Sequence, residues 1–592
     1  MSIGWRDRAQ IAAQLARAAL TWLRRDPGYP SPVPDNPRFQ SARAAALLIA
    51  DGDVVAVSGM GAHQHASIVY AAIRERFERT GHPAGLTLIN VGGHGGRGLA
   101  PGTLEELGRR GLCTRFITSH FETFHAMLEL AESGHCELQC IPFGVLTLLF
   151  DALGRGRRSV LTRVGVGTFL DPRVGRGSPV VDRAGGQLVA VQGDRLRFRI
   201  PPIDVAILNA PAADRHGNLY AKHSAAIGES RELARAARRH RGRVIANVGL
   251  IVDEACERVF LPGRGIDAVV YHPDTEQTAA VPHRAHWPMF TTESDVPIER
   301  ALARVRFVNS LLPAIPRRTP ADAALARLAA ATLVANVDRG ATVSIGTGLP
   351  EEVAPAIWEA GRSDELTFCV ESGVVGGLPA PGLYFGAALG PARIGSSAEL
   401  FKRCGRHLDA TCLGALEVDG LGDVNVSKRG AGPRHYVGPG GFSDFCTAAD
   451  AIVFVFAWMR GGEIEVEGAR LRIVARGTPK LVDRVAEVTF SGARALAAGK
   501  RIFYVSHVGV FRLCERGIEL VCAMPGIDVR RDILDFAPIE IRLPGRGRTP
   551  RVPRSIVTGR RLAWSQVLDA RHAERAGSAR HSASRRPPDR GV

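Results

Sequence analysis

The sequence predicts two open α/β domains of related design in one chain, with a helical extension before them and a basic tail after them. At 592 residues the chain is too long for one hydrophobic core, because single cores stop growing beyond about 250–300 residues. Apolar, β-branched runs alternate with helical segments such as 66–79 and 321–337, which is the pattern of open α/β sheets. Several segments of the first half also recur in the same order in the second half, which indicates an internal repeat.

The first expected element is an amphipathic helix at residues 5–25, with Ile11, Leu15, Ala18 and Trp22 along one stripe. A helix packed on the protein surface or at an oligomer contact is the favoured interpretation. Docking on a membrane is the alternative, because the polar face is rich in arginine. The sequence shows no apolar run long enough to span a bilayer and no signal-peptide core at its start.

The positive charge of the chain is concentrated at its C-terminus. The net charge is +17, and the segment from Gly545 to Val592, with 12 Arg, no Lys and three acidic residues, contributes +9 of it. Because this segment is poor in apolar residues, we expect it to be disordered. A solvated tail is favoured over an arm that contacts nucleic acid or a membrane. The expected division of the chain is an extension at 1–38, a first α/β domain at 39–300, a linker at 301–320, a second α/β domain at 321–543 and the tail at 544–592.

Two pairs of strand-like segments mark the internal repeat. DGDVVAVSGMG at 51–61 and RGATVSIGTG at 339–348 each have the pattern of a buried strand that runs into a glycine turn. LTLINVGGHGGRG at 86–98 and LTFCVESGVVGG at 366–377 each have the pattern of a short strand followed by a glycine loop. Ligands of open α/β sheets bind beyond the carboxyl ends of the strands. We therefore expect a site between the halves, at the two glycine loops.

A third correspondence is a matched spacing of aspartate and glycine. In each half an Asp is followed ten residues later by a second Asp and thirteen residues later by a Gly. These residues are Asp204, Asp214 and Gly217 in the first half, and Asp409, Asp419 and Gly422 in the second. Because the offsets match without a gap, the two halves are expected to share one local structure.

Several common chemistries have no motif in this chain. There is no GxSxG, no Walker A motif and no HExxH. Gly93, Gly95 and Gly98 satisfy GxGxxG, but the following LAPGT segment does not allow the helix that a dinucleotide site requires. His63 and His65 are interpreted as polar turn residues, with a metal pair as the alternative. The ten cysteines are scattered, which favours reduced thiols and a cytoplasmic protein.

Glu371 is the most informative single residue of the sequence. It ends an apolar run and opens a glycine-rich loop, where an acid would repel a phosphate. One interpretation is a helix cap or a loop acid that accepts hydrogen bonds from amides. The other is a carboxylate nucleophile, since its small neighbours give a substrate access and backbone N–H groups can stabilise an oxyanion by about 3 kcal/mol per donor.

The segment around Glu371, VESGVVGGLPAPGLYFGAA, resembles the catalytic segment of family I coenzyme A-transferases, in particular the single-chain acetate/propionate and 3-oxoacid types. The resemblance extends over about residues 40–543, outside the N-terminal helix and the tail. It includes VGVGTFLDPR at 164–173, GTGLPEEVA at 346–354, DGLGDVNVSKRG at 419–430 and GPGGFSDF at 438–445.

The resemblance implies a ping-pong transfer of coenzyme A between a short-chain acyl-CoA and a carboxylate, with Glu371 as the nucleophile and a Glu371–CoA thioester as intermediate. The expected partners are acyl-CoA and small carboxylates of short-chain fatty acid or ketone body metabolism, and a second copy of the chain in a homo-oligomer. The coenzyme A thioester is a substrate, so no metal or redox cofactor is expected.

The resemblance also implies the remaining site residues. His94, Gly93 and Gly95 in the first half and Gly440 and Gly441 in the second would line the oxyanion and acyl side. Gly346, Gly348, Asn425, Gly438 and Phe442 would bind coenzyme A. The alternatives are a tight turn at 438–442, a simple strand–helix turn at 346–348 and a structural role for the Asn425 amide.

Two residues depart from the family pattern. His94 stands where a glutamine usually completes the oxyanion hole, and Phe143 stands where the family's Pro-Gln-Gly segment has a polar residue. A histidine can also titrate or position water. A hydrolase of acyl-CoA on the same scaffold is therefore the first alternative, and a non-catalytic acyl-CoA-binding protein is the second.

Overall fold

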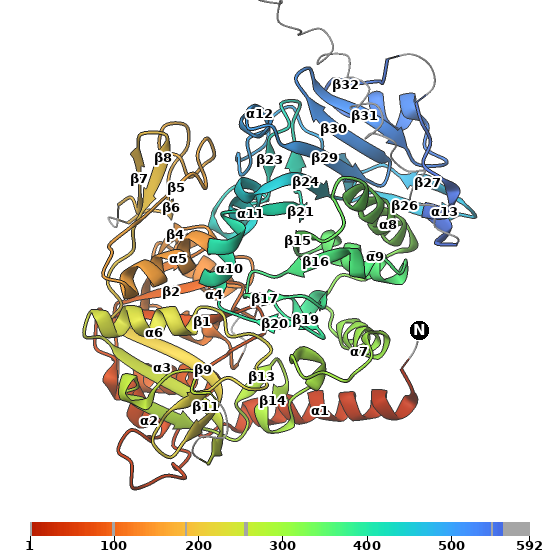
Figure 1. Cartoon of the computed structure of the whole chain (residues 1–592). Helices are drawn as coiled ribbons and strands as arrows, with labels where there is room; N and C mark the ends of the chain where they lie inside the picture. Colours follow the sequence, from red (N-terminus) through yellow and green to blue (C-terminus); the bar gives the residue numbers. More distant parts are fainter. Residues whose placement is uncertain (1–2, 97–100, 184–185, 254–257, 546–548, 561–592) are drawn as a thin grey trace, which may run out of the picture.

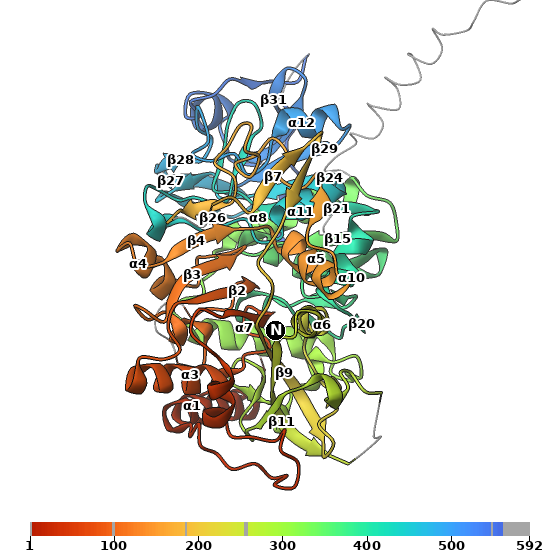
Figure 2. The same cartoon turned by 90° about the vertical axis from the view of Figure 1, so that its left-hand side faces the viewer.

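The computed structural model describes residues 3–96, 101–183, 186–253, 258–545 and 549–560. It consists of two α/β halves, the first in red to yellow and the second in green to blue (Figure 1). Viewed from the side, the first half lies below the second (Figure 2). Buried apolar side chains of both halves belong to one contiguous cluster, so the halves are packed together and not only tethered.

The first half contains one large, mostly parallel sheet with the strand order β12-β11-β9-β1-β2-β3-β4-β6. Only β6, at the edge beyond β4, and the short β10 beside β9 are antiparallel. The strands are β1 (Val54–Met60), β2 (Leu86–Gly92), β3 (Cys113–Thr118), β4 (Glu137–Cys140), β6 (Pro179–Val181), β9 (Val205–Asp214), β10 (Leu219–Tyr220), β11 (Arg243–Val252) and β12 (Ala268–Tyr271). The helices include α2 (Ala42–Ala45), α3 (Ser67–Thr80), α4 (His125–Glu132), α5 (Phe143–Gly154) and α6 (Ser230–Arg239). Strands β5 (Val160–Thr162), β7 (Val189–Gln192) and β8 (Arg195–Phe198) form a small separate sheet.

The second half contains a mixed sheet with the order β20-β17-β16-β15-β21-β24-β29-β30-β31-β32. Its strands are β15 (Ala341–Ile345), β16 (Leu366–Cys369), β17 (Val374–Val375), β20 (Arg393–Ile394), β21 (Leu408–Gly414), β24 (Ala449–Val455), β29 (Arg501–Ser506), β30 (Gly509–Cys514), β31 (Gly517–Ala523) and β32 (Ile541–Arg542). Its helices include α8 (Pro320–Ala335), α9 (Val353–Glu359), α10 (Ser397–Cys404), α11 (Phe442–Ala448) and α12 (Gly492–Ala497). A hairpin of β26 (Glu463–Glu467) and β27 (Arg470–Ala475) lies beside α8.

The predicted internal repeat is confirmed by the topology. In the first sheet β1 lies between β2 and β9, followed by β11 and β12. In the second sheet β15 lies between β16 and β21, followed by β24 and β29. All of these pairs are parallel. Parallel strands need crossover connections, which explains why helical segments separate the strand-like runs of the sequence.

The matched aspartates make equivalent hydrogen bonds in the two halves. Asp204 accepts from the backbone N–H of Val54 at 2.9 Å, and Asp409 accepts from that of Thr342 at 2.7 Å. Asp214 and Asp419 each accept N–H groups of the turn that follows them. The glycines of these turns, Gly217 and Gly422, have φ values of 83° and 75°, a conformation that favours glycine.

Four helices join the halves. Helix α5 of the first half contacts α10 and α11 of the second, and it also contacts α6. Two carboxylates accept hydrogen bonds across the boundary between the halves. Ser396, the N-cap of α10, donates to Glu232 of α6 at 2.9 Å, and Asp444 of α11 accepts from the N-terminus of α5. The relative position of the halves is therefore set by polar contacts as well as by the shared core.

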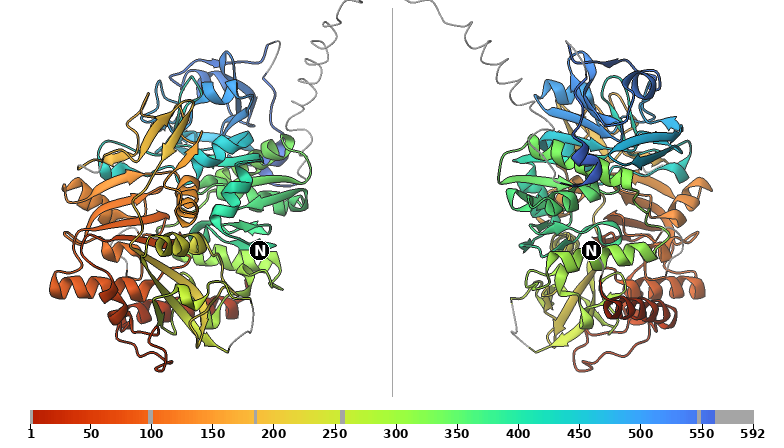
Figure 3. Two further views of the ribbon diagram at one scale, coloured as in Figure 1. Left: turned by 60° about the vertical axis from the view of Figure 1, so that its left-hand side comes forward. Right: turned by 90° about the vertical axis from the view of Figure 1, so that its right-hand side faces the viewer.

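The predicted N-terminal helix is confirmed as α1 (Trp5–Arg24). It lies along the outside of the first half, beside helix α7 (Ile298–Leu311) (Figures 1 and 3). Ile11 is buried, Asp7 pairs with Arg300 at 3.0 Å, and the Trp22 indole donates to Glu276 at 3.0 Å. Ile11 of the apolar stripe thus packs on protein, as the interpretation of a helix on the protein surface expects. The linker expected at 301–320 contains most of α7.

The ordered body extends beyond the expected boundary at residue 543. Helix α13 (Arg554–Thr558) packs on α8, and Arg327 donates to the carbonyls of Ile556 and Val557 at 2.6 and 2.7 Å. Both of these side chains are buried. The expected disorder at 549–560 was wrong, because two apolar residues among the arginines fill a gap beside α8. Residues 561–592 of the predicted tail lie outside the described residues. None of the described helices is long and apolar enough to cross a lipid bilayer.

Candidate active site

Glu371 lies in a tight turn directly after β16, at the carboxyl end of that strand, as the sequence predicts. The turn is closed by hydrogen bonds from Val370 N–H to the Val374 carbonyl and from Gly373 N–H to the Val370 carbonyl, both at 2.9 Å. Gly373 has a φ of 98°, and a Cβ there would lie 2.2 Å from the Gly395 carbonyl oxygen. The turn therefore requires glycine at this position, for backbone conformation and for space.

The Glu371 carboxylate faces the backbone of Gly441, which donates a hydrogen bond to it. A Cβ at position 441 would lie 2.9 Å from both Cδ and Oε1 of Glu371, so glycine leaves room for the carboxylate in its present position. Burial raises the pKa of Glu371 to about 7, against the opposing effect of the Gly441 N–H. The residue as a whole keeps partial exposure, as a group that must meet a substrate requires.

The loop at 438–442 is held between the two halves. Gly440 donates to the Ser119 carbonyl at 2.9 Å and accepts from Phe143 N–H at 3.0 Å. Gly438 has a φ of 77°, and a Cβ there would lie 2.4 Å from the Ser119 carbonyl oxygen. Of the two second-half residues predicted on the oxyanion side, Gly441 thus faces Glu371, whereas the N–H of Gly440 is bonded to the first half.

Asp444 is a second buried carboxyl group in this region, and the sequence interpretation missed it. It accepts from the N–H groups of Gly144 and Val145, at 3.0 and 3.1 Å, and so caps the N-terminus of α5. A Cβ at position 144 would lie 2.6 Å from Asp444 Oδ1, which explains that glycine. Burial and the negative charge of Glu371 raise the pKa of Asp444 well above its usual range. Its place three residues after Gly441, at the start of a helix, was the available signal.

Phe143 contributes to the core between the halves. The ring is buried and lies 5.7 Å from that of Phe401 in α10. The departure from a polar residue at this position therefore adds apolar packing between α5 and α10.

His94 lies in a buried cluster of the first half. Its ring stacks on that of His65 at 3.8 Å, and its Nε2 lies 3.2 Å from the Tyr70 hydroxyl. Burial and the two neighbouring histidines hold the pKa of His94 well below its usual range, so the imidazole is neutral. Within the described part of the chain no hydrogen bond joins His94 to Glu371. Gly93 packs against Gly61 and Gly95 against Thr123, and Gly98 lies outside the described residues.

His63 and His65 are buried side chains with different partners. His63 Nε2 lies 3.2 Å from the Tyr384 carbonyl oxygen of the second half, and His65 Nε2 lies 3.0 Å from that of Gly61. Burial lowers the pKa of each to about 4. The two histidines lie in and beside the turn at 61–64, as the sequence predicts, and both side chains are buried there.

The residues expected to bind coenzyme A occupy separate places. Asn425 is fully buried, donates to Glu417 and to the Lys428 carbonyl, and accepts two N–H groups. Because all its hydrogen-bonding groups are used within the protein, the structural alternative holds for this amide. Phe442 is buried and stacks on Phe454 at 5.7 Å. Gly346 and Gly348 form the turn after β15, where the Gly348 carbonyl accepts from Arg318 at 2.7 Å.

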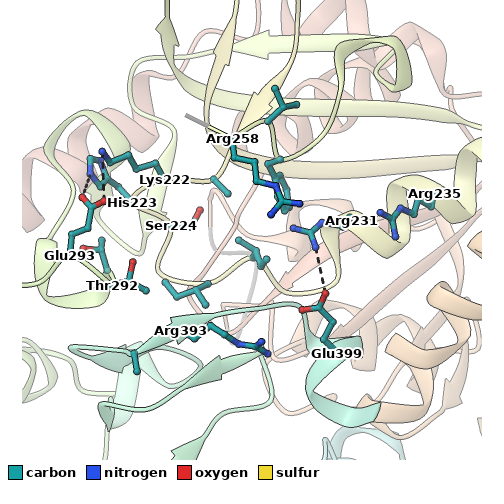
Figure 4. A pocket seen from close by; sticks show the side chains of 17 residues that line it. Lys222, His223, Ser224, Arg231, Arg235, Arg258, Thr292, Glu293, Arg393 and Glu399 are labelled. Atoms are coloured by element: carbon teal, nitrogen blue, oxygen red, sulfur yellow. Dashed lines mark ion pairs between the residues drawn. The ribbon is translucent and has the colours of Figure 1, made fainter. Parts of the chain in front are cut away.

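A pocket of about 900 Å³ lies at the boundary of the halves (Figure 4). Its first-half wall comes from the segment 221–235 and from residues 258–260 and 291–293, and its second-half wall comes from 392–399. Strand β20 of this wall pairs with β17, which directly follows Glu371. Five of the 17 residues that line the pocket are arginine or lysine, and sequence reasoning did not single out any of them.

Comparisons with known proteins agree with the geometry. A model of the coenzyme A transferase family matches residues 39–272. The chain is 32% identical over 516 residues to a caffeate CoA-transferase of Acetobacterium woodii, which covers 84% of this chain and 93% of that protein. It is 28% identical over 514 residues to the acetate CoA-transferase YdiF of Escherichia coli K12, with 84% and 92% covered.

Solved structures of other proteins share this fold. The apoenzyme of the acyl-CoA transferase YdiF from Escherichia coli O157:H7 matches with a TM-score of 0.77 at 24% identity, covering 91% of this chain and 99% of that chain. A thioester complex of the same protein with CoA matches with a TM-score of 0.75, covering 89% and 98%. At this identity the likeness concerns the fold, and it confirms the predicted pair of open α/β domains.

Proposed function

This chain belongs to the coenzyme A transferase family, and from that membership we propose that it moves coenzyme A between a short-chain acyl-CoA and a carboxylate acceptor by a ping-pong reaction on Glu371. The observation that supports this most is the environment of Glu371. A carboxyl group at the end of a strand, with a pKa of about 7 and one glycine amide against it, has the properties of a nucleophile that is poorly solvated and about half ionised at neutral pH.

In the first half-reaction the Glu371 carboxylate attacks the thioester carbonyl of the donor. The carbon–sulfur bond breaks, which yields an acyl-glutamyl anhydride and the thiolate of coenzyme A. The thiolate then attacks the glutamyl carbonyl, and the donor acid leaves as a carboxylate. Glu371 now carries coenzyme A as a thioester, and an acceptor carboxylate reverses the steps to leave as the new acyl-CoA. The two substrates supply every group that is transferred, so the scheme needs no metal or redox cofactor.

The protein positions the hydrogen-bond donors around Glu371 and stabilises the negative charge that develops in the reaction. The Gly441 N–H, which contacts the carboxylate in the resting state, would stabilise the oxyanion that forms when the glutamyl carbonyl is attacked. The clamped loop at 438–442 keeps this donor in place, since Gly440 is bonded on both sides to the first half. Exclusion of water protects the anhydride and the thioester from hydrolysis.

Mass spectrometry of the intact protein and its peptides tests the proposal. Incubation with acetyl-CoA, propionyl-CoA or caffeoyl-CoA without an acceptor should add coenzyme A to the peptide that contains Glu371. The caffeoyl donor is included because one relative is named a caffeate CoA-transferase. Glu371→Ala should lose both the adduct and transfer activity. Asp364→Ala, which removes an exposed acid near the same strand, should retain both.

Two outcomes would contradict the proposal. Transfer activity in Glu371→Ala, or an adduct on another peptide, would exclude Glu371 as the nucleophile. Release of free thiol from wild-type protein without an adduct and without an acceptor would indicate hydrolysis, the alternative considered from His94. Among the described residues His94 makes no hydrogen bond to Glu371, and no observation favours that alternative.

A further inference from the structure

Eight exposed arginine residues gather where helices α5 and α6 of the first half end. The segments 155–158 and 235–243 contain eight arginines and no acidic residue, so these 13 residues carry a charge of +8. The proposed reaction on Glu371 makes no use of this charge. The members of this arginine surface, all of them exposed, are Arg155, Arg157, Arg158, Arg235, Arg238, Arg239, Arg241 and Arg243.

The two segments are brought together by the packing of their helices. Helices α5 and α6 lie side by side (Figure 2). A Cβ at Gly154, the last residue of α5, would lie 3.0 Å from the Cβ of Arg235. A Cβ at Gly156 would lie 3.1 Å from Nη2 of Arg239. The carboxyl ends of the two helices therefore meet, and their arginines form one continuous surface.

Most of the positive charge of the arginine surface is not neutralised by acids. Asp151 pairs with Arg155 at 3.0 Å, and Asp267 pairs with Arg238 at 2.9 Å and with Arg243 at 3.5 Å. Like charges held close together repel one another and favour a bound anion. Within the part of the chain that the structure describes, no ion pair to an acid is made by the other five members, which are Arg157, Arg158, Arg235, Arg239 and Arg241.

Local structure explains only part of this surface. The dipole of a helix attracts cations to its C-terminus, but the effect falls off within the last turn. Arg157 and Arg158 come after the end of α5, and Arg241 and Arg243 come after the end of α6. Arg241 has a φ of 62°, a backbone conformation that suits glycine better than arginine. Neither the helix dipoles nor the turn geometry therefore accounts for the arginines beyond the helix ends.

The kind of partner follows from the side chains that this surface lacks. The segments 155–158 and 235–243 contain no exposed large apolar side chain and no Phe, Tyr or Trp. A protein partner would need an apolar or aromatic anchor at the centre of the interface, and unpaired bases would need aromatic rings on which to stack. The phosphate backbone of a duplex needs only cations and N–H donors. The planar guanidinium group supplies both, because it binds a phosphate through two parallel hydrogen bonds.

We propose that the arginine surface binds the phosphate backbone of double-stranded nucleic acid without reading the base sequence. Such binding depends steeply on salt, because each phosphate contact releases counterions and lowers the slope of log K against log salt by about 0.9. Contacts from the five arginines without an acid would therefore give a slope of about −4 to −5. The inference goes beyond the transfer of coenzyme A and does not depend on Glu371.

The test measures binding of the full chain to a fluorescent DNA duplex of about 30 base pairs, by anisotropy at salt concentrations from about 50 to 200 mM. The test variant replaces four arginines of the surface that make no ion pair and do not line the pocket between the halves, as Arg157→Gln/Arg158→Gln/Arg239→Gln/Arg241→Gln. The control variant removes the same charge from exposed arginines of the second half, as Arg460→Gln/Arg484→Gln/Arg516→Gln/Arg530→Gln. We expect the Kd of the test variant to rise by at least about tenfold and its salt slope to weaken by about 3 to 4. The control should change by less than about threefold.

Several results would overturn the inference. Both variants keep the arginines of the C-terminal segment 561–592, so an equal loss of binding in both would show that overall charge holds the duplex. The absence of duplex binding by the wild type would also refute it. Binding to vesicles of anionic phospholipid that the test variant loses, with duplex binding kept, would assign the surface to a lipid headgroup layer instead.

Activity and folding provide the remaining controls. The test variant should transfer coenzyme A with wild-type kcat and KM, and a raised KM for acyl-CoA would assign these arginines to the substrate. A melting temperature equal to that of wild type shows that the test variant is folded. If it melts lower, the double variant Arg157→Gln/Arg158→Gln, which changes only exposed residues after α5, should still raise the Kd by at least about threefold, and an unchanged Kd would refute the proposal.

Discussion

Gly441→Ala should place a methyl group against the nucleophile without straining the backbone. The φ of Gly441 is −85°, which any residue adopts, so the effect is steric. The new Cβ would lie 2.9 Å from Cδ and Oε1 of Glu371, whereas non-bonded carbon atoms prefer about 3.5–4.0 Å. The carboxylate or the loop must therefore move by about 0.6–1 Å. A misplacement of about 1 Å can cost about 100-fold in rate, and we expect kcat to fall by about 10- to 100-fold.

Steady-state transfer and formation of the coenzyme A adduct on Glu371 should both slow in Gly441→Ala. Substitutions at two other glycines distinguish the steric effect at Gly441 from backbone strain and from the general effect of a glycine-to-alanine change. A Cβ at Gly265 meets no atom within 4 Å, and its φ is not positive, so Gly265→Ala should keep wild-type kcat. A Cβ at Gly440 also meets no atom, but its φ is 55°, so Gly440→Ala should lower stability by about 1–2 kcal/mol through backbone strain. Wild-type kcat in a folded Gly441→Ala variant would refute the placement of the carboxylate against residue 441.

Four further predictions follow from burial. Because burial raises the pKa of Glu371 to about 7, kcat/KM should fall as the pH drops below about 7; a flat profile down to pH 5 would contradict this. The ionised buried carboxylate destabilises the fold above its unfolded pKa of 4.5, so Glu371→Gln should melt higher than wild type at pH 8, and the difference should vanish below pH 4.5. Asp444→Asn should lose part of the cap on α5 and about 1–3 kcal/mol of stability, measured by denaturant unfolding; an unchanged midpoint would show that the cap is not needed. A chain that ends at residue 560 should unfold like the full chain, whereas one that ends at 543 should lose about 3–6 kcal/mol with the buried Ile556 and Val557; equal melting of the two would contradict the packing of α13.

Much of the fold was predictable because its signals are local. The strand-like runs, the crossover helices and the matched aspartates each concern residues within a short stretch of chain. Asp204 and Asp409 anchor equivalent strands through equivalent hydrogen bonds, so their common spacing identified the repeat. Glu371 was predictable for the same reason, since an acid directly after a buried strand lies at the edge of the sheet where ligands bind.

Other residues were misjudged because their roles depend on distant partners. His63 and His65 belong to a polar segment of the sequence but are buried, His63 against the Tyr384 carbonyl of the second half and His65 against the His94 ring. Asn425 matches a site segment, yet its amide is fully used in its own turn. Residues 549–560 have the composition of a disordered tail, and two buried side chains were enough to fold them onto α8.

The sequence by itself determined that the protein consists of two related α/β halves and that Glu371 stands at a strand end in a loop of small residues. Only the tertiary structure decided what surrounds that carboxylate. Gly441 is 70 positions away from it in the chain, Asp444 caps a helix 300 positions away, and the arginines of the pocket come from separate segments of both halves. The physical reason is that the burial of Glu371, which raises its pKa, and the charge of the pocket both depend on which residues lie nearby in space. The order of residues along the chain does not specify those neighbours.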